Sequence, residues 1–230
     1  MAELKKPLFG NIKGSFGNAV FRQRHGKNYL VQKPSTYTPP DTEDYFIRTT
    51  KFRLASKISS LINSEPTLRE IWSIVKPKNQ TLYNYLISVV YPSLSVDSVN
   101  PSLRIVPDSK VGVRLNNVSI AQDKLTVNLH PLTTASLIDS NIEKNSRIIS
   151  IVTLINPTNV DLPNFDAVSI SSKLVEVNLD NPLEFEFILS TTNQMKLSSY
   201  QSKSLFSSLI TYDENQKVIH FSNTFYSDLG

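Results

Sequence analysis

The stretch Ile148-Ile-Ser-Ile-Val-Thr-Leu-Ile155 is almost continuously apolar and rich in β-branched residues. Such a run is typical of a central strand that is buried on both faces. Elsewhere in the second half of the chain, apolar and polar residues alternate, which is typical of strands with one buried face. The alternating sets are Val111/Val113/Leu115, Leu125/Val127/Leu129, Val175/Val177/Leu179 and Phe185/Phe187/Leu189.

Turn residues connect these strands. Asp123 separates two of the alternating sets, and the polar run 213–217 separates two apolar stretches, residues 205–212 and 218–225, as in a hairpin. Seven or eight strands in about 120 residues is the number found in an immunoglobulin-like sandwich, although the Cys pair and strand Trp of antibody domains are absent. The sequence therefore predicts an immunoglobulin-like antiparallel β-sandwich over residues 108–230.

The first half of the chain has a different period. The run 41–44 (Asp-Thr-Glu-Asp) suits the start of a helix, which should continue to about Asn63. A capping-box pattern, Thr67-x-x-Glu70, predicts a second helix that contains Trp72, and a third helix is expected from Asn79 to Val90. The apolar stripe of the first helix is Tyr45, Phe52, Ala55, Ile58 and Ile62. We expect Trp72 to be a core residue with no ligand role.

The N-terminal segment reads as an arm. Two short strands flank His25-Gly26-Lys27 and predict a β-hairpin, and the prolines that follow from Pro34 predict an extended connector. The glycines at 10, 14 and 17 indicate strand bulges or close backbone packing rather than a phosphate-binding loop. We therefore predict an α+β protein in three parts: an arm plus a small helical unit over residues 1–91, a Ser/Pro-rich linker over 92–107, and the sandwich.

The composition excludes several classes of protein. With 40% hydrophobic and 19% charged residues among 230, the chain folds around a core. It has no cysteine, which excludes disulfides, thiolate metal sites and a cysteine nucleophile. The chain has no run of about 18 consecutive apolar residues, so no membrane-spanning segment is predicted. The N-terminus has no apolar segment like that of a secretory signal, so synthesis in the cytoplasm is expected.

Catalytic constellations are not evident in the sequence. His25, His130 and His220 have no carboxylate or second histidine two to four residues away, and no phosphate-binding or nucleophile motif occurs. Glu184 and Glu186 should share one face of a strand, but a solvent-exposed face would look the same. We therefore expect no enzymatic activity, no cofactor and no metal.

Positive charge is concentrated at the N-terminus. Residues 1–60 contain eleven Lys/Arg and four Asp/Glu, whereas residues 61–230 contain thirteen and sixteen. Three interpretations stay open: an arm that docks on an acidic neighbouring subunit or a sheet edge, an arm that binds nucleic acid, and a solvated hairpin. The predicted partner-binding residues are Phe21, Arg22, Arg24, Lys27 and Tyr29.

The N-terminal pattern also resembles a known family. GxxxGxxGNxVFxxxxGKxYxxxKP, which runs here from Gly10 to Pro34, is similar to the opening of an uncharacterised Bacteroidota domain-of-unknown-function family. The resemblance implies a helical segment containing a Trp, here Trp72, and an all-β C-terminal half that ends in a hairpin. The chain departs from the family at residues 45–50, where a Gln/Arg-rich stretch is usual. No activity is established for that family, so the resemblance implies architecture alone.

These observations favour a non-enzymatic structural or adaptor component of a multi-subunit assembly. The expected context is a phage or phage-like particle of a Bacteroidota host, in which the chain would serve as a capsid decoration, head or tail protein. The alternatives are a nucleic-acid-binding protein that uses the basic arm and a carbohydrate-binding sandwich.

Overall fold

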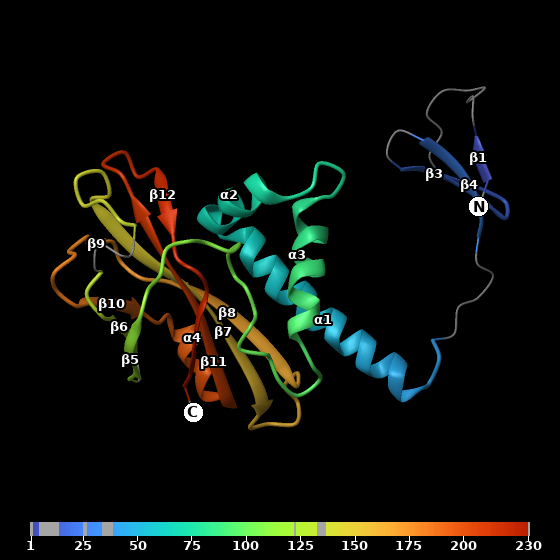
Figure 1. Ribbon diagram of the computed structural model, residues 1–230. Coiled ribbons are helices and arrows are strands. Elements are labelled where there is room, and N and C mark those ends of the chain that lie inside the picture. Colours follow the sequence, from blue (N-terminus) through green and yellow to red (C-terminus); the bar gives the residue numbers. More distant parts are fainter. Residues whose placement is uncertain are drawn as a thin grey trace. The chain divides into compact units, whose positions relative to one another are not determined.

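The computed structural model describes residues 2–4, 14–24, 27–33, 39–121, 123–132 and 137–229 (Figure 1). The chain divides into two compact units, Met1–Phe46 and Ile47–Gly230. It is a mixed α+β protein whose sheets are almost entirely antiparallel, as the sequence predicts.

The N-terminal unit is built around a four-stranded sheet. Its strands are β1 (Ala2–Leu4), β2 (Gly14–Phe16), β3 (Ala19–Arg24) and β4 (Lys27–Gln32), in the order β1-β4-β3-β2. The predicted hairpin is β3–β4, although His25 and Gly26 of its turn lie outside the described residues. Gly17 adopts φ +56° in a two-residue turn between β2 and β3. A glycine is favoured there because a side chain disfavours that region, so Gly17 forms a turn and not the expected bulge.

The helices begin and end at identifiable residues. Helix α1 (Glu43–Ser64) starts where the Thr42 side chain accepts a hydrogen bond from Tyr45 N, as expected from the run 41–44. Helix α2 (Pro66–Val75) does not use the predicted capping box, because Pro66 occupies the first turn and Glu65 precedes it without a side-chain cap. Helix α3 (Leu82–Val90) is capped by Thr81, which accepts from Asn84 N, and continues into the single turn η1 (Tyr91–Ser93).

The C-terminal half contains two further sheets. The six-stranded sheet has the order β12-β11-β7-β8, with β13 also paired to β11 and β9 to β7. The three-stranded sheet has the order β10-β6-β5, and helix α4 (Thr191–Ser198) precedes β11. The strand bounds are β5 (Leu115–Ile120), β6 (Lys124–Leu129), β7 (Asn145–Pro157), β8 (Phe165–Ser171), β9 (Val175–Glu176), β10 (Leu183–Ile188), β11 (Tyr200–Tyr212), β12 (Val218–Phe221) and β13 (Phe225–Asp228).

Strand β7 is central, as its composition predicts, and it separates two hydrophobic clusters. Ile149 and Ile151 pack on the side of the helices, in a cluster with Ile58 and Leu86. The residues that alternate with these along β7, such as Leu154, point to the other face and pack on the side of the three-stranded sheet. The six-stranded sheet is therefore covered by helices on one face and by the second sheet on the other (Figure 1).

The segment 92–107 differs from the expected linker. Leu94, Leu103 and Ile105 are buried in the helix-side cluster. Trp72 is 2% exposed, and its Nε1 donates a hydrogen bond to the Ile105 carbonyl at 2.9 Å, so it is a core residue as predicted. Ser and Pro interrupt the periodicity without removing the apolar side chains, and the segment packs as an irregular part of the core. Along the chain, the boundary between the two compact units falls between residues 46 and 47 and not within 92–107.

Two predicted strands are shorter than their alternation indicates. At 175–179 only Val175 and Glu176 pair as a strand, because Asn178 accepts hydrogen bonds from the backbone of the next residues and turns the chain. At 111–115 the strand begins only at Leu115, because Val111 instead forms a bridge with Ser222.

Candidate functional site

The N-terminal sheet brings most of the predicted arm residues to one face. Arg22 lies opposite Tyr29 in the β3–β4 register, and Arg24 lies opposite Lys27. Because successive residues of a strand point to opposite faces, Arg22, Tyr29 and Lys27 share a face, which we call the basic face. The side chain of Arg24 lies outside the described residues. Phe21, opposite Leu30, belongs to the other face, so the five predicted residues do not form one surface.

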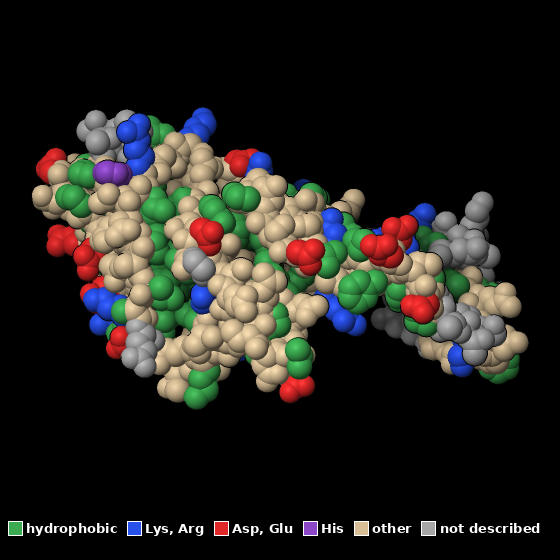
Figure 2. All heavy atoms as spheres, turned by 90° about the horizontal axis from the view of Figure 1, so that it is seen from below, with side chains coloured by type: hydrophobic (Ala, Val, Ile, Leu, Met, Phe, Trp, Pro, Cys, Tyr) green, Lys and Arg blue, Asp and Glu red, His purple; other side chains and the backbone are tan. Residues whose placement is uncertain are grey.

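The exposure of the basic face suits a binding surface. Arg22 and Lys27 are exposed, and Tyr29 is half-buried. A guanidinium placed opposite a tyrosine ring offers both charge and a flat apolar surface, which proteins use for contacts with carboxylates, phosphates and bases. On the face of the molecule drawn in Figure 2, the described Lys/Arg and Asp/Glu side chains are intermixed and form no large patch of one sign.

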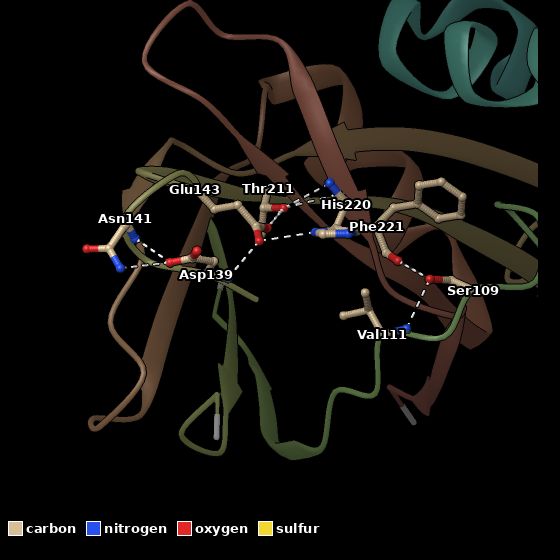
Figure 3. A network of polar contacts seen from close by, with 8 residues as sticks. All are labelled: Ser109, Val111, Asp139, Asn141, Glu143, Thr211, His220 and Phe221. Atoms are coloured by element: carbon tan, nitrogen blue, oxygen red, sulfur yellow. Dashed lines mark hydrogen bonds and ion pairs between the residues drawn. The ribbon is translucent and has the colours of Figure 1, made fainter. Parts of the chain in front are cut away.

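A buried polar cluster joins the segment before β7 to strands β11 and β12 (Figure 3). Glu143 is 1% exposed, and its Oε1 accepts from Asp139 N at 2.8 Å and lies 3.1 Å from His220 Nδ1. Thr211 Oγ1 donates to Glu143 Oε2 and accepts from His220 N. The cluster satisfies a buried carboxylate and so fixes this loop to the β11–β12 hairpin.

Sequence reasoning missed this cluster because Glu143 and His220 are 77 positions apart. No carboxylate lies two to four residues from His220 in the sequence, and no local signal marks Glu143 as its partner. A His–carboxylate pair can orient a general base, but in this cluster the Thr211 hydroxyl bonds the carboxylate and does not meet the imidazole ring. The arrangement therefore has the form of a structural cluster.

A second cluster connects α1 and α4 to β8. Asp166 Oδ1 lies 3.0 Å from Lys57 Nζ, and its Oδ2 lies 2.7 Å from Lys196 Nζ. Burial alone raises the pKa of Asp166, but the bonds from Lys196 and Lys57 outweigh it, so the pKa is below its usual value. The carboxylate is therefore held ionised between two lysines and joins the helices to the sheet.

The two carboxylates on β10 share an outward face, as predicted. Glu186 is bound to Lys124 of the neighbouring strand, which with its charge holds the pKa of Glu186 below the usual value. Among the described residues there is no group of three or more His, Asp or Glu that could hold a metal ion. No helix in the described part of the chain is long and apolar enough to cross a membrane.

Comparison with known proteins identifies no family. No family model matches the chain, and no curated protein matches it. Two solved structures show weak similarity: β-glucosidase 3B from Thermotoga neapolitana in complex with glucose, at 11% identity, and the same enzyme with glycerol, at 10%. Each has a TM-score of 0.22, and the match covers 71% of this chain and 23% of the glucosidase chain. Similarity at this level supports no conclusion about fold or activity.

Proposed function

We propose that the protein is a non-enzymatic structural or adaptor component of a multi-subunit assembly, attached to a neighbouring subunit through its N-terminal sheet. The observation that carries the proposal is the basic face formed by Arg22, Lys27 and Tyr29 on a compact unit of its own. A small sheet that is separate from the main core can bind a partner without disturbing that core. Cations on such a face select an acidic partner and speed association.

The proposal extends to architecture and context. Two antiparallel sheets share one hydrophobic cluster, which supports an immunoglobulin-like sandwich for residues 108–230. Sandwich domains are used widely in particle shells and tails, and this analogy of fold supports a phage or phage-like particle of a Bacteroidota host. In this proposal the chain is made in the cytoplasm and incorporated into the particle as a capsid decoration, head or tail protein of the resembled family.

Incorporation into a particle tests the proposal. The chain, with an affinity tag, is produced in the host that carries its gene, and sedimentation separates particles from free protein. The double variant Arg22→Glu/Lys27→Glu should shift the chain from the particle fraction to the free fraction with its circular dichroism unchanged. Arg69→Glu, an exposed charge reversal on α2, is the control and should stay in the particle. Equal incorporation of all three proteins would contradict the proposal.

The basic face also favours a second function, nucleic-acid binding. Arg22 and Lys27 could contact phosphates while Tyr29 offers a ring for stacking. The two functions differ in their salt dependence, because each phosphate contact adds a slope of about −0.9 to log affinity against log salt on duplex DNA. Titration of the chain with random-sequence DNA at several salt concentrations measures this slope. A slope near zero would exclude nucleic-acid binding through phosphate contacts.

A further inference from the structure

An apolar groove of about 390 Å³ borders the end of β5 beside helix α4. Its apolar and charged lining comprises Ile120, Ala121, Leu189, Met195, Leu197 and Lys203. Ile120 lies opposite Leu125, so its register places it on the core-facing side of the three-stranded sheet, yet it is 40% exposed. The sheet ends at β5, and apolar surface that another strand would cover is left open.

Strand β5 is an edge without the charged residues or prolines that usually protect one, although an irregularity between Leu115 and Asn117 interrupts its pairing with β6. It is the outermost strand of the order β10-β6-β5, and Leu115–Ile120 reads LNNVSI, without a charged residue or proline. Edge strands are usually protected by Lys, Pro or a covering segment, because their free backbone groups pair readily with another chain. The edge and the groove therefore lie together at a place that suits the addition of a strand.

The N-terminal sheet presents a matching edge. Its outermost strand β2 (Gly14–Phe16) is exposed throughout, and Phe16 is 83% exposed, the most of any large aromatic side chain among the described residues. Phe16 lies opposite Ala19, on the face of the sheet away from Arg22 and Tyr29. Exposed aromatic side chains that fit an apolar recess are the usual anchors of protein interfaces.

The charges of the two regions are complementary. Residues 1–40 contain seven Lys/Arg and one acidic residue, Glu3. Near the groove, Glu186 pairs with Lys124, and Asp123 and Glu184 also interact with that lysine, so three carboxylates lie near two cations, Lys124 and Lys173. Glu184 and Glu186 point outward from the three-stranded sheet. If β2 extends this sheet with Phe16 facing the groove, the basic face lies on the same outward side as these carboxylates.

We propose that the N-terminal sheet of one copy docks on the β5 edge of a second copy, where β2 adds as a further strand and Phe16 occupies the groove. The inference rests on the proposed binding role of the arm and names its partner, another copy of this chain. The contact is head-to-tail, because the arm and the groove are different surfaces. Complementary charges steer the encounter, and the backbone pairing and Phe16 provide the affinity.

Complementary variants test the contact. Phe16→Ser removes the anchor, and Met195→Lys places a charge in the groove; because Met195 is 64% exposed, the substitution leaves the core intact. Analytical ultracentrifugation of the full chain should show self-association of the wild type and an apparent dissociation constant at least about tenfold higher for each variant. An equimolar mixture of the two variants should recover a 1:1 complex, because one intact arm and one intact groove remain.

Matched controls and opposite outcomes complete the test. Phe52→Ser and Val160→Lys make the same changes at other exposed sites and should leave association unchanged. A monomeric wild type at every concentration, or a mixture that does not associate, overturns the inference. Hydrogen-exchange protection of β2 in a monomer shows that the arm docks within its own chain, which also overturns it. The two proposals can fail separately. If the wild type is monomeric but Arg22→Glu/Lys27→Glu is lost from the particle, the adaptor function holds and the partner is a protein other than this chain.

Discussion

Replacement of Trp72 by Ala tests how the helices are joined to the rest of the large unit. The indole ring is 2% exposed, meets the Tyr85 ring edge-on at 5.9 Å, and donates from Nε1 to the Ile105 carbonyl at 2.9 Å. Truncation of a buried Trp costs about 3–5 kcal/mol. The Ile105 carbonyl, left without its donor, adds about 1–3 kcal/mol. We expect the free energy of unfolding to fall by about 4–8 kcal/mol, a large part of the 5–15 kcal/mol typical of a domain.

Urea denaturation followed by far-UV circular dichroism measures the change, because Trp72 is the only tryptophan and its fluorescence disappears in the variant. Trp72→Phe keeps most of the ring but loses the hydrogen bond, so an intermediate loss is expected. Ile74→Ala on the same helix is the control, because Ile74 is 79% exposed and should change stability by less than about 0.5 kcal/mol. Equal stabilities of Trp72→Ala and Ile74→Ala would refute the reasoning.

Three further outcomes follow from the fold. A fragment of residues 108–230 should be unfolded by circular dichroism, because removal of the helices exposes one face of β7 and β11; a folded fragment would contradict the buried role of segment 92–107. Asp166→Asn should lower stability by about 1 kcal/mol or less; because the folded-state pKa of Asp166 is below its unfolded value, this loss is present at pH 7 and disappears as pH falls through the folded pKa. Exposed Asp108→Asn is its control, and a pH-independent difference for Asp166→Asn would exclude the ion pairs as its cause. Thr81→Ala should cost about 1 kcal/mol by thermal denaturation, with Thr81→Ser near the wild type, because the hydroxyl caps α3; an equal loss in both variants would contradict the cap.

Local sequence signals predicted those elements whose stability depends on near neighbours. Helix α1 follows its capping run and the stripe of Ala55, Ile58 and Ile62, although Phe52 of the same stripe is exposed. The turn at Asp123 and the hairpin after Tyr212 also lie where polar turn residues indicated them. In each case the residues that decide the structure are close together in the chain.

Features that depend on distant residues could not be read in this way. The segment 92–107 has no period, and its burial is decided by Trp72 and the sheet that it meets. Helix α4 is short and polar, so its sequence shows no apolar stripe that would predict a helix. The Ser190 cap and the packing of Leu197 define it instead. Composition predicted that positive charge gathers in the arm, but only the β3–β4 register shows that Phe21 lies on the opposite face from Arg22 and Tyr29.

The pairing of β7 with β11 affects how the chain folds during synthesis. These strands are joined along their whole length, from Tyr200 opposite Pro157 to Tyr212 opposite Asn145, and β8, β9, β10 and α4 lie between them in sequence. Contacts of such wide sequence separation form slowly. At roughly 5–20 residues per second, the ribosome adds β11 on the order of ten seconds after helix α3. Until then the apolar faces of α1–α3 have only part of the sheet to cover them. We therefore expect newly made chains to need chaperone protection until the last hairpin has been synthesised.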